Sequence, residues 1–241
     1  MGSVKTSRIE VRAPGGAMPC FLAEPEGAGR FPAVLVLMEA FGLVRSIESV
    51  AQRLAAEGYL ALAPDLYYRD LPNDTARYDD LPRAMELMGA LLRRGEAYVG
   101  DLAAAIDFLE SRPNARARRV GVTGFCMGGA LTFASACLLP ERIAAAAPFY
   151  GGGIANLLPR ADRIQCPLLL FFGERDAHIP LDQVREIEKR LRELGKQFEI
   201  QVYPGADHGF FCEDRAPVYH PEAAADAWRR LLDFFAAHLA G

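Results

Sequence analysis

The sequence predicts an α/β fold with a mostly parallel central sheet, helices on both faces and an antiparallel N-terminal edge. Short, wholly apolar runs alternate along the chain with amphipathic segments of ten or more residues, which is the pattern of strand–helix–strand crossovers. The apolar runs, such as residues 33–38, lack polar alternation and therefore suit strands buried on both faces. No linker-like or low-complexity stretch interrupts the chain, so we expect a single domain over residues 1–241.

The first predicted element is an antiparallel hairpin. Residues 4–12 and 18–23 form its strands, and the turn-rich Ala13-Pro14-Gly15-Gly16 joins them. After strand 33–38 comes an amphipathic helix over residues 45–57, and Gly58 suits its C-cap. The polar stretch 64–81 can form either an ordered wall or a lid. The same alternation predicts strands 59–63, 119–123, 144–149, 168–172 and 198–203, and helices 82–93, 97–111, 127–139, 181–195 and 221–239.

Composition and charge exclude several classes of function. The net charge is −4 with acidic and basic residues interleaved, so the chain lacks the basic stripe that nucleic-acid binding requires. The apolar runs are too short for a membrane span, and the first residues contain no stretch of signal-peptide length. An odd number of irregularly spaced cysteines favours a reducing, cytoplasmic compartment over a disulfide framework or a structural zinc site. The cysteines are Cys20, Cys126, Cys137, Cys166 and Cys212.

The segment Gly124-Phe125-Cys126-Met127-Gly128 carries the nucleophile-elbow pattern, with cysteine as the nucleophile. The pattern places Cys126 in a sharp strand-to-helix turn, where the flanking glycines remove side chains that would collide. A helix N-terminus favours the thiolate form of a cysteine. The backbone amide of Met127 would point at a developing oxyanion. The alternative is a glycine-rich turn in which the cysteine is a small buried hydrophobe.

Two later segments supply an acid and a base. Asp176 follows the apolar strand 168–172, and His208 lies in the turn after strand 198–203. Functional residues gather at the carboxyl ends of parallel strands, so we expect these side chains near Cys126. The chain order nucleophile, acid, base is typical of the α/β-hydrolase fold. His208 would take a proton from the thiol or from an attacking water, and Asp176 would fix its orientation.

The remaining candidates for these roles are weaker. His178 lies close to Asp176 and is the one serious rival base, although it precedes the start of a helix at Pro180. Asp207 is interpreted as a turn former rather than the acid. No pair of side chains has convincing metal-ligand spacing, so neither a metal nor a cofactor is predicted.

Five motifs resemble those of a known family. They are Glu39-Ala40-Phe41-Gly42-Leu43, Pro64-Asp65-Leu66-Tyr67, Gly124-Phe125-Cys126-Met127-Gly128-Gly129, Gly173-Glu174-Arg175-Asp176 and Tyr203-Pro204-Gly205-Ala206-Asp207-His208-Gly209-Phe210. From about residue 18 to 238 the chain resembles the dienelactone hydrolase (carboxymethylenebutenolidase) family. A glutamate after the first parallel strand, combined with cysteine in the elbow, is quite specific, because most α/β-hydrolases have serine at the elbow and small residues at the other site.

The resemblance implies a role for Glu39. In the family this glutamate pairs with the resting thiol, and substrate binding frees a thiolate for the histidine. A carboxylate near a thiol disfavours the thiolate, so Glu39 could keep Cys126 neutral until substrate arrives. A helix-start carboxylate that faces the helix dipole is the alternative for Glu39. The backbone amide of Ala40 would complete the oxyanion hole with that of Met127.

Substrate selection is where the resemblance weakens. The family's enzymes hold a substrate carboxylate with arginines and a tyrosine. Arg83 stands where one arginine is expected, although a solvated helix arginine explains it equally well. Leu87 and Cys212 stand where the tyrosine and the second arginine are expected, so the natural substrate need not be a dienelactone. Phe41 and Tyr150, at strand ends, are predicted walls of the pocket.

The triad and the resemblance imply an ester or lactone hydrolase that forms a thioester on Cys126. A small ester or lactone is the expected partner, and a monomer is expected rather than an oligomer. Two alternatives stay open. One is a thioesterase, acyl-transferring or peptide-cleaving relative, because the same fold hosts all of these. The other is a protein that binds small molecules without turnover, against which a complete triad argues.

Overall fold

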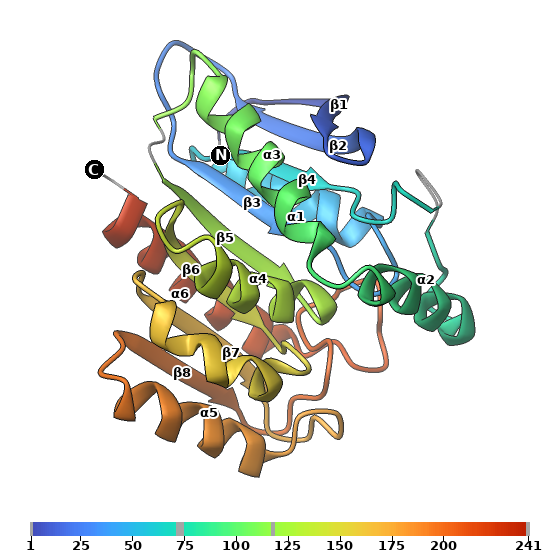
Figure 1. Cartoon of the computed structure of the whole chain (residues 1–241), viewed down its shortest axis with the longest axis vertical. Coiled ribbons are helices and arrows are strands. Elements are labelled where there is room, and N and C mark those ends of the chain that lie inside the picture. Colours follow the sequence, from blue (N-terminus) through green and yellow to red (C-terminus); the bar gives the residue numbers. More distant parts are fainter. Residues whose placement is uncertain (1, 71–74, 117–118, 240–241) are drawn as a thin grey trace. The chain divides into compact units, whose positions relative to one another are not determined.

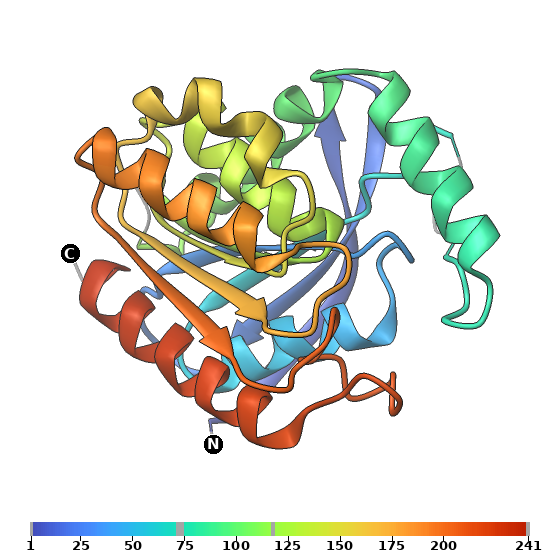
Figure 2. The same ribbon diagram turned by 90° about the horizontal axis from the view of Figure 1, so that it is seen from below.

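The computed structural model describes residues 2–70, 75–116 and 119–239. The chain folds as two compact units, Met1–Val120 and Gly121–Gly241. In both units helices cover the strands from both faces (Figures 1 and 2). That the two units form one domain stays a prediction.

Unit 1 contains the N-terminal hairpin and the first parallel pair. Its strands follow the order β1-β2-β4-β3. The β1/β2 and β2/β4 pairs are antiparallel, and the β3/β4 pair is parallel, which confirms the antiparallel N-terminal edge. The strands are β1 (Val4–Ala13), β2 (Gly16–Pro25), β3 (Ala33–Leu37) and β4 (Leu60–Pro64).

The helices of unit 1 differ in how far their apolar residues are buried. Helix α1 buries one face, from Ile47 to Ala55, and Gly58 with φ +92° follows its C-cap at Glu57 as predicted. Helices α1 and α3 lie on opposite faces of the strands (Figure 2). Helix α2 exposes Leu81, Met85 and Leu92, each by half or more of its surface. The helices are α1 (Arg45–Ala56), α2 (Leu81–Arg93) and α3 (Ala97–Ser111).

Unit 2 continues the alternation of strands and helices. Its strands follow the order β5-β6-β7-β8, and the β6/β7 and β7/β8 pairs are parallel. Helices α4 and α5 cover one face and α6 the other (Figure 2). The elements are β5 (Val120–Phe125), α4 (Met127–Leu138), β6 (Ile143–Phe149), the 3₁₀ helix η1 (Ile154–Arg163), β7 (Leu168–Gly173), α5 (Leu181–Glu193), β8 (Phe198–Tyr203) and α6 (Pro221–Leu239).

Burial follows the apolar runs. Every residue of β3, β4, β5 and β7 is buried, as predicted for strands covered on both faces. All the predicted strands and helices are present, with ends that differ by at most two residues. Helix η1 was not predicted, because Pro159 interrupts a segment that is too short for a clear helical period.

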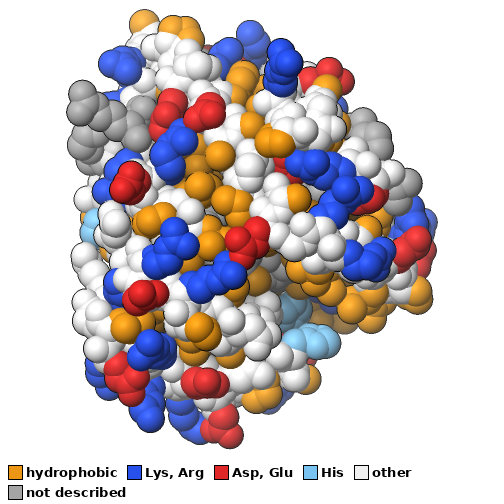
Figure 3. Space-filling model, viewed as in Figure 1, with side chains coloured by type: hydrophobic (Ala, Val, Ile, Leu, Met, Phe, Trp, Pro, Cys, Tyr) orange, Lys and Arg blue, Asp and Glu red, His pale blue; other side chains and the backbone are white. Residues whose placement is uncertain are grey.

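The surface agrees with the mixed charge of the sequence. Acidic and basic side chains are interspersed over the face shown in Figure 3. Within the described residues, no helix is both long enough and apolar enough to cross a membrane.

Candidate active site

Cys126 occupies the turn between β5 and α4 in unit 2. Its backbone has φ 56° and ψ −115°, a region that residues with side chains rarely adopt and that costs about 1–3 kcal/mol. The turn is held by backbone hydrogen bonds: the Cys126 amide donates to the Phe149 carbonyl at 3.1 Å, and the Ala130 amide donates to the Cys126 carbonyl at 3.2 Å. Because α4 begins at Met127, Cys126 stands at a helix N-terminus, as the elbow pattern predicts.

A close approach of two glycines allows this turn. A Cβ atom on Gly129 would lie 2.3 Å from the carbonyl oxygen of Phe149, and one on Gly151 would lie 2.7 Å from the carbonyl carbon of Gly129. Real Cβ contacts are not this short, so the first turn of α4 can lie against the chain after β6 only when both residues are glycine. The sequence motif contained Gly129, but its contact with Gly151 could not be read from the motif.

Asp176 and His208 meet in the same unit. The Nδ1 atom of His208 lies 2.7 Å from Oδ2 of Asp176, and the Asp176 side chain is fully buried. The other carboxylate oxygen accepts backbone N–H groups of His178 at 2.8 Å and Ile179 at 3.1 Å. Asp176 is therefore fixed by three hydrogen bonds, and it fixes the imidazole of His208 in turn.

The loops that carry these two residues are tied to each other. The Arg175 amide donates to the Ala206 carbonyl at 2.8 Å, and the Gly205 amide donates to Oε2 of Glu174 at 2.8 Å. A Cβ atom on Gly173 would lie 2.5 Å from the carbonyl oxygen of Ala206, so the loops meet backbone to backbone. The spacing of acid and base is thus set by the ends of the neighbouring strands β7 and β8.

The protonation of His208 is shifted by its partners. Burial lowers the pKa of the imidazole, but hydrogen bonds to Asp176 and Cys126, together with their charges, outweigh burial and raise the pKa from 6.5 to about 10. These contacts therefore stabilise the imidazolium that forms when His208 accepts a proton.

Two aromatic rings flank His208. The Tyr150 ring meets the His208 ring edge to face at 5.2 Å, and Tyr150 is buried with φ 35°. The ring of His178 meets His208 at 5.1 Å, also edge to face. Asp176 accepts the backbone N–H of His178 but the ring nitrogen of His208, so the geometry favours His208 as the base. Asp207 accepts the backbone N–H of His208 at 2.9 Å, as a turn former does.

Glu39 lies in unit 1, two residues beyond β3, and only 2% of its surface is exposed. Its Oε1 atom accepts hydrogen bonds from Ser46 Oγ at 3.0 Å and from the Tyr78 hydroxyl at 3.1 Å. Ser46 belongs to the first turn of α1, and Tyr78 belongs to the polar stretch before α2. Sequence reasoning missed both hydroxyls. A serine at a helix start and a tyrosine in an unassigned stretch carry no pattern that links them to Glu39.

The other predicted residues of unit 1 have ordinary structural contacts. Phe41 is buried and packs edge to face on Tyr78 at 4.8 Å. The carbonyl of Ala40 accepts the Tyr67 hydroxyl at 2.9 Å. Arg83 donates to Glu86 on α2 at 2.6 Å, so both interpretations of this arginine stay open. Leu87 and Cys212, the positions that depart from the family pattern, are buried.

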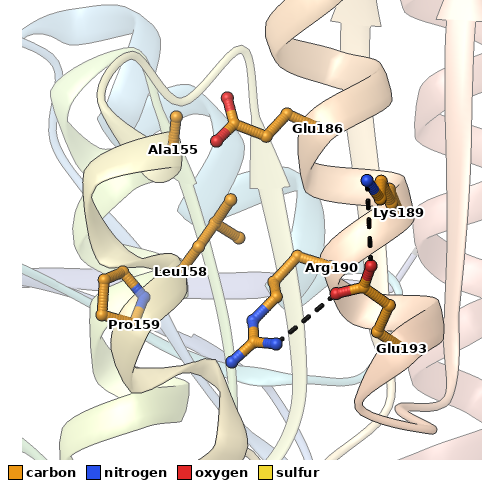
Figure 4. A pocket seen from close by; sticks show the side chains of 7 residues that line it. All are labelled: Ala155, Leu158, Pro159, Glu186, Lys189, Arg190 and Glu193. Atoms are coloured by element: carbon orange, nitrogen blue, oxygen red, sulfur yellow. Dashed lines mark hydrogen bonds and ion pairs between the residues drawn. The ribbon is translucent and has the colours of Figure 1, made fainter.

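A groove of unit 2 lies between η1 and α5, and its lining does not include Cys126, Asp176 or His208. Its rim is neutralised by its own ion pairs, since Glu193 lies 3.5 Å from Arg190 and 4.0 Å from Lys189 (Figure 4). It is lined by Ala155, Leu158, Pro159, Glu186, Lys189, Arg190 and Glu193. Among the described residues, no group of three or more His, Cys, Asp or Glu side chains could hold a metal ion.

Comparison with known sequences shows which family the chain matches. The family model described as "Dienelactone hydrolase family" matches residues 18–239. A protein from Synechocystis sp., named "Putative carboxymethylenebutenolidase", is 36% identical over 246 residues, which cover 98% of each chain. A protein of the same name from Escherichia coli is 36% identical and covers 92% of this chain and 83% of its own.

Solved structures show the same relationship. A "Putative Dienelactone Hydrolase" from Klebsiella pneumoniae matches 98% of this chain and 99% of its own, with 34% identity and a TM-score of 0.87. An acylaminoacyl peptidase matches 98% of this chain but 42% of its own, with 18% identity and a TM-score of 0.77, and so shows the fold alone. The predicted α/β-hydrolase fold is confirmed.

Proposed function

Because the chain belongs to the dienelactone hydrolase family, we propose that it hydrolyses small esters or lactones with Cys126 as nucleophile, His208 as base and Asp176 as the orienting acid. One observation carries the proposal. The His208 ring is hydrogen-bonded to both Asp176 and Cys126, and Cys126 is held in a strained turn at the start of α4. A structural cysteine needs neither the strain nor the imidazole.

The reaction proceeds in two steps. In the first, His208 takes the thiol proton and the thiolate attacks the carbonyl carbon of the substrate. The oxyanion is stabilised by the backbone amide of Met127 and, as the family resemblance implies, that of Ala40. The intermediate collapses to a thioester on Cys126, and the departing alcohol oxygen takes the proton from His208. For a lactone the alcohol stays on the acyl chain, so the product of the full reaction is a hydroxy acid.

The second step hydrolyses the thioester and regenerates the free enzyme. His208 takes a proton from a water molecule, whose oxygen attacks the thioester carbonyl. The carbon–sulfur bond breaks, the acid leaves and Cys126 recovers its proton. Throughout both steps Asp176 keeps Nδ1 of His208 occupied, so that Nε2 is the nitrogen that exchanges protons. Glu39 disfavours the thiolate of the resting enzyme until substrate binds, a role that the resemblance assigns to it.

Neutral substrates are favoured over dienelactone. Two of the family's carboxylate ligands, the tyrosine and the second arginine, are replaced by Leu87 and Cys212, and both side chains are buried. Loss of one charge-assisted contact weakens carboxylate binding by about 1.5–3 kcal/mol. We expect short neutral esters, or lactones without a free carboxylate, to be turned over with higher kcat/KM than dienelactone.

The test is hydrolysis of p-nitrophenyl acetate, p-nitrophenyl butyrate and dienelactone by the wild type, by Cys126→Ala and by Cys126→Ser. We expect kcat to fall at least about 1,000-fold in Cys126→Ala. Cys166→Ala is the matched control, because it removes a different buried thiol of the same unit and should keep full activity. Full activity of Cys126→Ala, or no turnover by the wild type, would sink the proposal.

A further inference from the structure

The carboxyl group of Glu39 belongs to a triangle of three oxygen atoms within unit 1. Ser46 Oγ lies 3.0 Å and the Tyr78 hydroxyl 3.1 Å from Oε1 of Glu39. The two hydroxyl oxygens lie 2.7 Å from each other. Every side of the triangle is therefore a hydrogen-bonding distance. The proposed mechanism uses Glu39 but assigns nothing to these hydroxyls.

A count of protons shows what the triangle can accommodate. Each hydroxyl brings one proton, and an ionised carboxylate brings none, so two protons serve three sides. When Glu39 is ionised, the two hydroxyls can both donate to it, or one can donate to the other and the second to Glu39. When Glu39 carries a proton on Oε1, three protons serve three sides. The same three atoms thus support both protonation states, with only hydroxyl rotation between them.

The backbone around the triangle is fixed from two sides. The Ala76 amide donates to the Phe41 carbonyl at 2.9 Å, and the Tyr78 ring packs on the Phe41 ring. The Gly42 amide donates to the Glu39 carbonyl at 3.0 Å, which closes the turn that carries the carboxylate. Tyr78 is therefore attached to the turn of Glu39 by backbone, ring and hydroxyl contacts together.

We infer that Ser46 and Tyr78 are positioning residues that hold the Glu39 carboxyl group in place in both of its protonation states. The inference rests on the proposed function, in which Glu39 acts on a nucleophile that changes from thiol to thiolate. In that proposed function the carboxylate takes up a proton from solvent when the thiolate forms and releases it when the thiolate disappears. Without the hydroxyl pair the buried carboxyl group would lose these hydrogen bonds in both states.

The experiment removes the hydroxyls singly and together. The variants are Ser46→Ala, Tyr78→Phe and the double variant, each in the wild type and in a Glu39→Gln background. The measurements are kcat and KM for p-nitrophenyl acetate, and the rate at which iodoacetamide alkylates Cys126 without substrate. We expect each single change to lower kcat about 5- to 10-fold with KM within about twofold. Ser46→Thr, which keeps a hydroxyl, should restore most of the loss.

The Glu39→Gln background distinguishes a loss of activity that acts through Glu39 from a general loss of structure. Residues that act through Glu39 should show non-additive effects, so Tyr78→Phe should lower kcat by less than about twofold once Glu39 is replaced. Tyr68→Phe is the matched control, because Tyr68 donates to the buried carboxylate of Asp101 at 2.8 Å in the same unit. It should change thermal unfolding as Tyr78→Phe does and leave kcat within about twofold.

Two sets of results overturn different statements. Equal losses of kcat with and without Glu39, or unchanged kcat in Ser46→Ala and Tyr78→Phe of an enzyme that requires Cys126, would overturn the positioning role alone. Full activity of Cys126→Ala would overturn the proposed function instead. Recovery in Ser46→Thr and non-additivity with Glu39→Gln support the inference.

Discussion

The two units hold their carboxylates in different ways. In unit 2 the carboxylate of Asp176 is bonded to the ionisable ring of His208, which is bonded in turn to the ionisable side chain of Cys126. In unit 1 the carboxylate of Glu39 accepts the neutral hydroxyls of Ser46 and Tyr78. In the proposed mechanism His208 exchanges protons while Asp176 holds its ring, whereas the two hydroxyls keep the Glu39 carboxyl group in position. The difference matches the two proposed roles, chemistry for Asp176 and His208 and regulation of the nucleophile for Glu39.

The largest expected effect tests the contacts among Asp176, His208 and Cys126 in unit 2. Asp176→Asn should keep the fold but remove the charge that sets the orientation and charge of His208, and we expect kcat to fall about 10³- to 10⁴-fold. Asp207→Asn is the control, since Asp207 is exposed and its side chain accepts the backbone N–H of His208. Its kcat should stay within about threefold. Steady-state hydrolysis of p-nitrophenyl acetate measures kcat for both variants. Similar losses of kcat in the two would contradict the role assigned to Asp176.

The second prediction concerns the strained turn that the unit 1 site lacks. Gly129→Ala places a Cβ atom 2.3 Å from the Phe149 carbonyl oxygen, so backbone must move. We expect a loss of about 3 kcal/mol in the free energy of unfolding, measured by urea denaturation. Gly152→Ala, which meets nothing within 4 Å, should change it by less than about 0.5 kcal/mol. Equal stability of the two variants would show that the turn is not rigid.

The difference between the two units also explains which site contacts could be predicted from the sequence. The elbow around Cys126 is a local pattern, and the acid and base each follow an apolar strand, so spacing and chain order predicted where Asp176 and His208 lie. Their hydrogen bond then follows from the neighbouring positions of β7 and β8 in one sheet. Parallel sheet topology thus converts sequence order into proximity.

Contacts made by loops could not be predicted from the sequence. Tyr78 reaches Glu39 from a stretch without periodicity, and Ser46 reaches it from a helix start where serine is ordinary. The approach of Gly129 to Gly151 depends on how the chain leaves β6, which no motif encodes. Such contacts are set by tertiary packing rather than by local propensity.

The third prediction is the pH dependence of stability. His208 has its pKa raised from 6.5 to about 10, so the folded protein retains a proton that the unfolded chain loses in this range. The stabilisation is complete below about pH 6.5 and is lost as pH rises through about 10. Near pH 6 we expect the free energy of unfolding, measured by urea denaturation, to be about 1.5–3 kcal/mol larger for wild type than for His208→Gln. This difference should disappear by about pH 10. A gap that is constant with pH would contradict this.

The smallest expected effect sharpens the comparison most, because it predicts opposite directions for two readouts. Glu39→Gln keeps shape but cannot ionise, so kcat for p-nitrophenyl acetate should fall only about 10-fold, far less than in Asp176→Asn. If Glu39 suppresses the resting thiolate, alkylation of Cys126 by iodoacetamide should become faster in Glu39→Gln, whereas Asp176→Asn should slow it. Slower alkylation in both variants would place Glu39 among the groups that activate the nucleophile, and the functional distinction between the two carboxylates would be lost.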